Sequence, residues 1–248
     1  MISVKSPQEL ERMRRAGRIV AEVLAGLRER ARPGVTTASL DSWAERLIRR
    51  RGGVPSFKGY RGYPASVCIS LDAEIVHGIP GKRRLREGQI ASLDVGVMWD
   101  GYHADAAVTI GIGEVSSVAA DLMRVAAEAL SAGIRAARAG RRLGAVSHAI
   151  QATAESHGYD VIRDYVGHGI GREMHEDPQI PNFGHPARGP LLSPGMTLAL
   201  EPMLVVGDYR TRVLDDLWTV VTADGGLSAH FEHTIVITEG EAEVLTLP

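Results

Sequence analysis

The sequence contains one cysteine, carries a net charge of only −2 and has no long apolar run. The single thiol, Cys68, cannot form an internal disulfide, which favours a reducing compartment. No apolar segment approaches the ~18 residues that a membrane span requires. The first residues, MISVKSPQEL, lack the apolar region of a signal peptide, so we expect a cytoplasmic protein.

The near-neutral charge gives no reason to expect nucleic acid as the main partner. Two short basic runs, at residues 49–51 and 82–86, are most simply interpreted as solvated surface. The composition, with 44% hydrophobic and 23% charged residues, is typical of a globular protein. A chain of 248 residues can bury a large core, and we expect one domain over residues 1–248.

Helical and strand-like segments follow one another in the same order twice along the chain. The first helix begins at a capping box, Ser6-Pro7-Gln8-Glu9, and should end before Pro33-Gly34. Further helices are expected at 39–51, 116–139 and 143–157, and strands near 66–71, 90–110, 197–206 and 230–238. This order predicts two similar halves packed as one α+β domain. Residues 178–195, rich in Pro and Gly, should form an ordered loop beside a site.

The segment IASLDVGVMWDGYHADAAVTI, residues 90–110, predicts a hairpin with two aspartates on one face. Asp100-Gly101 is a strong signal for a two-residue turn, and it places Gly96 opposite Asp105. Asp94 then lies on the same face, diagonal to Asp105. Like charges this close repel each other unless a proton or a cation lies between them. The segment alone is equally compatible with a solvated face and with a cation site.

The second half of the chain also places charged residues within apolar strands. Glu201 lies in TLALEPMLVV and Glu232 in HFEHTIVIT, where a buried carboxylate must be paired, protonated or bound to a cation. Between them, VGHGIGREMHEDP contains His168 and His175 among glycines, which permit tight turns and close approach of the backbone.

Four carboxylates and one imidazole balance the charge of two divalent cations. This ligand set is dominated by oxygen, which favours Mn, Fe, Co or Zn over a thiolate-type site. Two such ions about 3.5–4 Å apart can activate a water and stabilise the oxyanion that forms when it attacks a carbonyl. The residues therefore predict metal-assisted hydrolysis.

The order Asp94, Asp105, His168, Glu201, Glu232, with the contexts GHGIGREMHEDP, LALEP and EHTIVIT, resembles the type I methionine aminopeptidases of the M24 metallopeptidases. The segments GYPASVCIS and VHGIP extend the resemblance over nearly the whole chain. It implies the pita-bread fold, an α+β domain with two pseudo-symmetric helix-helix-hairpin halves around a curved antiparallel sheet.

The same resemblance implies roles for these side chains around two divalent ions, which would be Co, Mn, Fe(II) or Zn. Asp94 would bind the first ion, and His168 and Glu201 would bind the second. Asp105 and Glu232 would be shared between the ions.

Three residues would have catalytic roles by the same resemblance. Glu201 would also shuttle protons from the attacking water. His175 would hydrogen-bond the substrate at the scissile carbonyl, and His77 would do so at the peptide nitrogen.

The resemblance further implies an apolar and aromatic methionine pocket, in which a thioether packs well against sulfur and aromatic edges. Its members would be Phe57, Tyr60, Tyr63, Cys68, Met174, Met203, Trp218 and His230. Met174 stands where relatives commonly carry Phe, and Phe57 stands where some bacterial members carry Cys. These departures concern the shape of the pocket and not the metal ligands.

The implied activity is removal of the N-terminal methionine from nascent proteins, after deformylation, when the second residue is small and uncharged. Nascent polypeptide N-termini would be the partners, and residues 82–86 are candidates for contact with the ribosome near its exit tunnel. We expect a monomer that binds neither membranes nor a specific nucleic acid.

Two other interpretations use the same fold. Prolidase or aminopeptidase P shares the ligands but carries an additional N-terminal domain, whereas only some 60 residues precede GYPASVC here. Non-catalytic pita-bread proteins, which bind RNA or other proteins, typically lose metal ligands, whereas this chain keeps all five and both accessory histidines.

Overall fold

The computed structural model describes residues 2–248. Its helices are α1 (Pro7–Arg30), α2 (Thr37–Arg50), α3 (Ser117–Ala136) and α4 (Gly144–Ser156), with a 3-10 turn, η1, at Tyr60–Gly62. The strands are β1 (Val54–Pro55), β2 (Val67–Leu71), β3 (Glu74–Val76), β4 (Ile90–Trp99), β5 (Tyr102–Gly111), β6 (Asp160–Val161), β7 (Gly167–Gly169), β8 (Glu176–Ile180), β9 (Thr197–Leu200), β10 (Met203–Val205), β11 (Thr211–Val213), β12 (Val220–Thr222), β13 (Ser228–His230), β14 (Glu232–Val236) and β15 (Glu243–Val244).

The helices agree with the sequence pattern. The capping box is present, because the Ser6 hydroxyl accepts from the Glu9 amide and the Glu9 carboxylate accepts from the Ser6 amide. All four predicted helices are confirmed to within three residues at each end.

Two predicted strands are interrupted, and the loop expected at 178–195 begins as strand. The segment 197–206 is divided into β9 and β10 at Glu201-Pro202, because Pro202 has no amide hydrogen with which to continue the ladder. The segment 230–238 is likewise divided into β13 and β14, which belong to different sheets. Residues 178–180 belong to β8.

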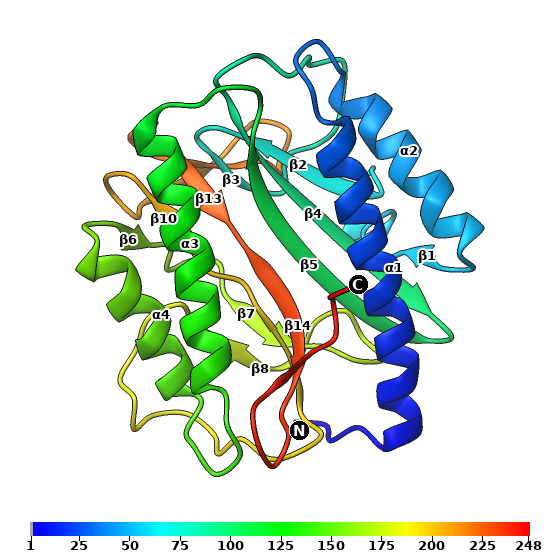
Figure 1. The fold of residues 1–248 in the computed structure, drawn as a ribbon, viewed down its shortest axis with the longest axis vertical. Helices are drawn as coiled ribbons and strands as arrows, with labels where there is room; N and C mark the ends of the chain where they lie inside the picture. The colour runs from blue at the N-terminus through cyan, green and yellow to red at the C-terminus, as the bar shows by residue number, and fades with distance from the viewer. Residues whose placement is uncertain (1) are drawn as a thin grey trace.

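The main sheet has nine strands, in the order β1-β4-β5-β14-β9-β7-β8, with β2 paired to β4 and β15 paired to β14. Its pairings are antiparallel, as predicted. Figure 1 shows α1 and α2 beside one half of this sheet and α3 and α4 beside the other, with β4, β5 and β14 crossing between the helix pairs. This arrangement matches the predicted α+β pattern of two similar halves.

The core lies between the helices and one face of the sheet. The face of the hairpin that carries no aspartate is apolar: Leu93, Val95, Val97, Ala104 and Ala106 are fully buried in a cluster with residues of α1 and α2. A second cluster joins α3 and α4 to β9 and β14. Burying each large aliphatic side chain contributes about 1.5–3 kcal/mol, so the fold is stabilised mainly on this face.

The opposite face of the hairpin is polar, as the turn chemistry predicts. Asp100 and Gly101 both have positive φ angles, 47° and 78°, the backbone of a two-residue turn matched to twisted strands. The resulting register pairs Gly96 with Asp105 and Asp94 with Ala107, so both aspartates share one face. The described residues include no helix that is both long and apolar enough to cross a bilayer.

Candidate metal centre and active site

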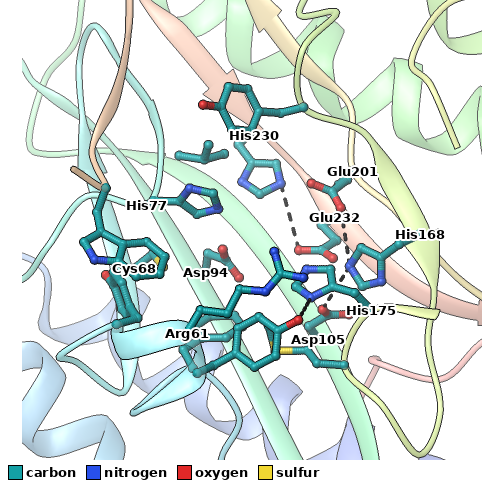
Figure 2. A pocket seen from close by; sticks show the side chains of 17 residues that line it. Arg61, Cys68, His77, Asp94, Asp105, His168, His175, Glu201, His230 and Glu232 are labelled. Atoms are coloured by element: carbon teal, nitrogen blue, oxygen red, sulfur yellow. Dashed lines mark hydrogen bonds and ion pairs between the residues drawn. The ribbon is translucent and has the colours of Figure 1, made fainter. Parts of the chain in front are cut away.

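Five predicted ligands meet in one cavity of about 300 Å³ on the polar face of the sheet (Figure 2). Asp94 lies on β4, Asp105 on β5, Glu232 on β14 and His168 on β7, and Glu201 directly follows β9. These five strands are consecutive in the sheet. Because neighbouring strands lie about 4.8 Å apart, one inward-facing residue from each is enough to assemble a compact cluster.

The side chains of this cluster lie close together and are largely shielded from solvent. His168 Nε2 lies 3.6 Å from Asp105 Oδ2 and 3.5 Å from Glu201 Oε1. Asp105, His168 and Glu232 each offer one ligand atom, and these atoms all lie within 4.8 Å of one another. Asp105 and Glu232 are each 3% exposed.

The tautomer of His168 leaves its Nε2 as an acceptor. Its Nδ1 lies 2.8 Å from the Gly169 carbonyl oxygen and therefore carries the proton. Burial lowers the pKa of His168 to about 4, so the ring is neutral at pH 7. An unprotonated Nε2 that faces two carboxylates cannot donate to either, whereas a cation placed among the three groups would be bound by all of them.

The carboxylates are electrostatically unfavourable without such a cation. Burial, and then repulsion from Asp105, raises the pKa of Asp94 well above its ordinary value. Burial and neighbouring carboxylates also raise the pKa of Glu201 and of Glu232. Burial raises that of Asp105, although His175 and Thr234 partly oppose the shift.

An unpartnered oxygen points to the same conclusion. Within the described chain, the buried Oδ1 of Asp94 has no hydrogen-bond partner. Buried polar atoms are normally paired, and oxygen ligands with one imidazole are the donors that Mn, Fe, Co and Zn accept. The residues present therefore fit divalent metal ions.

Two residues that sequence analysis missed hold the ligands in place. Thr234 Oγ1 donates a hydrogen bond to Asp105 Oδ1 at 3.1 Å and accepts one from the Asp105 amide at 3.0 Å. Asn182 donates to the Glu201 carbonyl oxygen at 3.1 Å, where the chain leaves β9. Thr234 could have been found, since it lies two residues after Glu232 and strand residues two apart share a face.

The other end of the cavity is apolar. A buried cluster of Phe57, Tyr63, Cys68 and Met174, with Tyr60 and Trp218 packed against it, forms the pocket wall. Gly96 makes room for this wall, because a Cβ at this position would lie 2.6 Å from Phe57 Cε1. The pocket therefore combines aromatic edges with two sulfur atoms.

The lining of the cavity differs from the predicted pocket at four positions. Of the described residues proposed for the pocket, Met203 alone lies outside its lining. Beyond the break at Pro202 the chain enters β10, and Met203 is fully buried in a separate cluster. Arg61, Val76 and Tyr165 line the cavity and were not predicted, since no motif distinguishes them.

The accessory histidines face the cavity as neutral rings. His175 Nδ1 lies 2.8 Å from the Tyr60 hydroxyl, and its ring lies 4.3 Å from that of His168. Burial lowers the pKa of His77 to about 4. Desolvation in the cavity, and then the neighbouring His168, also lower the pKa of His175 to about 4, although part of this residue is exposed. His77 has a φ angle of 61°, a strained backbone of the kind found at functional sites.

His230 is the most deeply buried of the predicted pocket histidines. It is 2% exposed, and burial lowers its pKa to about 3. Its Nε2 lies 3.9 Å from Glu232 Oε2 and has no hydrogen-bond partner among residues 2–248. The neutral ring of His230 is therefore a direct neighbour of the Glu232 carboxyl group.

Comparison with known proteins assigns the chain to a family. Residues 11–239 match the sequence profile of Metallopeptidase family M24. The chain belongs to this family. A methionine aminopeptidase of Clostridium acetobutylicum is 53% identical over 248 residues, which are 100% of this chain and 99% of the relative.

Solved structures agree with the M24 assignment. The crystal structure of a methionine aminopeptidase from Thermotoga maritima matches with a TM-score of 0.99 and 49% identity over 100% of both chains. A prolidase from Pyrococcus furiosus matches with a TM-score of 0.80 at 22% identity, over 99% of this chain and 65% of that chain. The resemblance inferred from the motifs and the pita-bread α+β fold are confirmed, and this M24 member is a metal-dependent hydrolase.

Metal should stabilise the protein more strongly as pH rises. The raised pKa values of Asp94, Glu201 and Glu232 mean that the folded, metal-free protein retains protons which the unfolded chain has released above about pH 4. The stability of the metal-free form therefore falls as pH rises through those raised values. Bound metal requires ionised carboxylates, so its stabilising effect should grow.

The gap in melting temperature between Mn(II)-loaded and chelated protein tests this expectation. This difference in melting temperature should widen from pH 6.5 to 8.5. The window starts at the ordinary pKa of histidine, so the neutral histidine rings affect the stability of the loaded and the chelated protein equally. The variant Glu232→Gln, which has one fewer carboxyl to titrate, should show a smaller widening. A gap that stays constant with pH would contradict the prediction.

Proposed function

We propose that the chain is a methionine aminopeptidase that acts on the N-termini of nascent proteins. The observation that carries this proposal is the cavity, in which a carboxylate-imidazole cluster lies next to an apolar, aromatic wall. The cluster would carry out hydrolysis, and the apolar wall would select the side chain of one residue. The methionine aminopeptidases to which the chain is similar over its full length support the same activity.

The pocket suits a methionine side chain. A flexible thioether makes favourable contacts with aromatic edges and sulfur atoms, which Tyr63, Trp218, Cys68 and Met174 provide. At about 300 Å³, the cavity lies at the lower end of the range for ligand sites, which suits one residue and the peptide bond that follows it. We further propose that the second residue is small and uncharged, and that deformylation precedes cleavage.

We assign the five ligands to two divalent ions, Co, Mn, Fe(II) or Zn. Asp94 would help to hold one ion, His168 and Glu201 would help to hold the other, and Asp105 and Glu232 would contribute to both. When bound, such ions lower the pKa of a water molecule and polarise a carbonyl group. Two ions are proposed because four carboxylates then balance the metal charge.

The remaining steps belong to the side chains of the chain itself. Glu201 would accept the proton of the attacking water and pass it to the leaving amine. His175 would donate Nε2–H to the carbonyl oxygen, because its Nδ1 can accept from the Tyr60 hydroxyl. His77 would hydrogen-bond the peptide nitrogen and thereby orient the scissile bond.

We also propose that the protein acts in the cytoplasm as a monomer. The main alternative is a proline-specific peptidase, for which the fold is shared but the identity is low. A binding module without catalysis is disfavoured, because it would have no need for buried carboxylates that repel one another.

The substrate assignment can be tested with two peptides. With added Mn(II), the protein should release methionine from Met-Ala-Ser and leave an Xaa-Pro peptide intact, and chelation should abolish the release. Free amino acid, measured by chromatography, is the readout. Cleavage of only the Xaa-Pro peptide would indicate a prolidase, and no cleavage with metal bound would indicate a binding module.

Replacement of His175 tests its assigned role. A neutral donor aimed at the developing oxyanion contributes more to the transition state than to the ground state. His175→Ala should therefore lower kcat by roughly 10²–10³, with a much smaller change in KM, as for loss of one oxyanion donor. Steady-state kinetics on Met-Ala-Ser provide the measurement. An effect confined to KM would reduce the histidine to a substrate-binding role.

The basic residues 82–86 are proposed to contact the ribosome. Arg83 is already paired with Glu74, whereas Lys82 and Arg86 are exposed. Reversing these two charges should lower co-sedimentation with ribosomes at low salt, because phosphate contacts are electrostatic, and should leave tripeptide hydrolysis intact. The control variant reverses Arg46 and Arg50 on α2. Equal ribosome binding by the wild type and both variants would refute the proposal.

A further inference from the structure

Lys5, near the N-terminus, is an almost completely buried lysine. It is 7% exposed, and its Nζ lies 2.7 Å from Glu176 Oε2 and 2.5 Å from Ser3 Oγ. A lysine is rarely buried to this extent unless it is paired, because removing its charge from water is unfavourable. The pair joins residues 171 positions apart, so it exists only in the folded chain.

The partner of Lys5 lies next to a proposed catalytic residue. Glu176 begins β8 and directly follows His175. We call residues 171–176 the histidine loop: they comprise most of the connection between β7 and β8 together with Glu176, the first residue of β8, and they carry both Met174 and His175. Both of these side chains line the cavity.

Lys5 contacts both ends of the histidine loop. At the first end its stem packs on Gly171, where an added Cβ would lie 2.4 Å from Lys5 Cε. At the second end its ammonium group holds Glu176, whose other oxygen accepts the Glu173 amide at 3.3 Å. Burial raises the pKa of Glu176, but the hydrogen bonds from Lys5 and Ser3 outweigh this effect and hold the pKa below its ordinary value.

The N-terminal segment is itself fixed in place. The Lys5 amide donates to the Gly195 carbonyl oxygen at 2.8 Å, which anchors the segment beside β9. Four residues later, Glu9 accepts from Arg172 of the histidine loop at 3.2 Å and from the Tyr102 hydroxyl. The loop is therefore held from outside the cavity by residues of the first ten positions.

We infer that the Lys5–Glu176 ion pair is a positioning device that sets the histidine loop, and with it the His175 ring, for the reaction. This inference rests on the proposed function, because it assigns His175 a role at the scissile carbonyl. Displacing a catalytic group by about 1 Å can lower the rate by as much as 10²-fold. An anchor one residue from His175 is well placed to prevent such a displacement.

Three variants separate positioning from stability. Lys5→Met should lower kcat on Met-Ala-Ser roughly 10- to 100-fold with KM changed less than about threefold. It should also lower the melting temperature, because it leaves Glu176 without its cation. The double variant Lys5→Met/Glu176→Gln removes that unpaired charge, so it should recover most of the stability but not the rate. Lys5→Arg, which keeps the charge, should retain most of the rate.

The Arg14–Glu243 pair provides a matched control. It also ties the N-terminal helix to a distant strand, with Arg14 Nε 2.6 Å from Glu243 Oε1, and the described ion-pair partners of Arg14 are Glu243 and Glu11, not residues of the histidine loop. Arg14→Met should therefore leave kcat unchanged. In hydrogen exchange of the Mn(II)-loaded proteins, Lys5→Met alone should accelerate exchange of the amides at 171–176.

The outcomes are distinguishable from failure of the proposed function. If wild-type protein does not release methionine, the proposed function fails, while hydrogen exchange still tests whether Lys5 orders the loop. If wild-type protein is active and Lys5→Met lowers only the melting temperature, with kcat and loop exchange unchanged, the positioning role is refuted. Equal rate losses in Lys5→Met and Arg14→Met would also refute it.

Discussion

The mutual repulsion of the buried carboxylates is the constraint on which this structure depends. Asp94, Asp105, Glu201 and Glu232 face one another in a cavity with little solvent, beside the unprotonated Nε2 of His168. Every atom at the centre of this cluster is an acceptor, so only protons or cations can make it favourable. Divalent ions satisfy the cluster and at the same time supply hydrolytic chemistry.

The fold tolerates this repulsion because the residues that stabilise it and the residues of the site lie on different faces of the sheet. Helices α1 to α4 and the apolar face of the sheet form the core, while the ligands project from the other face. Four of five consecutive strands each contain one ligand and the fifth, β9, ends directly before Glu201, so the ladder hydrogen bonds fix the positions of the ligands relative to one another. Thr234 and Asn182 then hold individual ligands from the neighbouring strand and loop.

Structure could be predicted from the sequence best where it is determined by residues that are adjacent in the chain. Asp100-Gly101 determines the turn, and the turn determines that Gly96 pairs with Asp105. The capping box at Ser6 and the ligand motifs are likewise contiguous signals. The break at Pro202 was missed, because apolar residues continue on both sides of it although the chain changes sheets. The family resemblance separately placed Met203 in the methionine pocket, whereas its side chain is fully buried in another cluster, with Ile75 and Val205.

Contacts between distant residues could not be predicted in this way. Arg61 and Tyr165 reach the cavity through loop geometry, which no periodicity encodes. The contact between Lys5 and Glu176 depends on where the N-terminal segment crosses the histidine loop. A lysine in SVKSP has nothing in its local sequence to distinguish it from a solvated one, and only its burial in the fold does so.

The most direct test of the account is a titration of chelated protein with Mn(II), in which bound metal is counted by elemental analysis while methionine release is followed. Activity should be absent without metal and should return as the ions bind, to a limit of two per chain. Asp105→Asn, which removes one shared charge, should fail to recover activity even in excess metal. Full activity in protein shown to be metal-free, or in Asp105→Asn, would contradict the central claim that the carboxylate cluster works through bound metal.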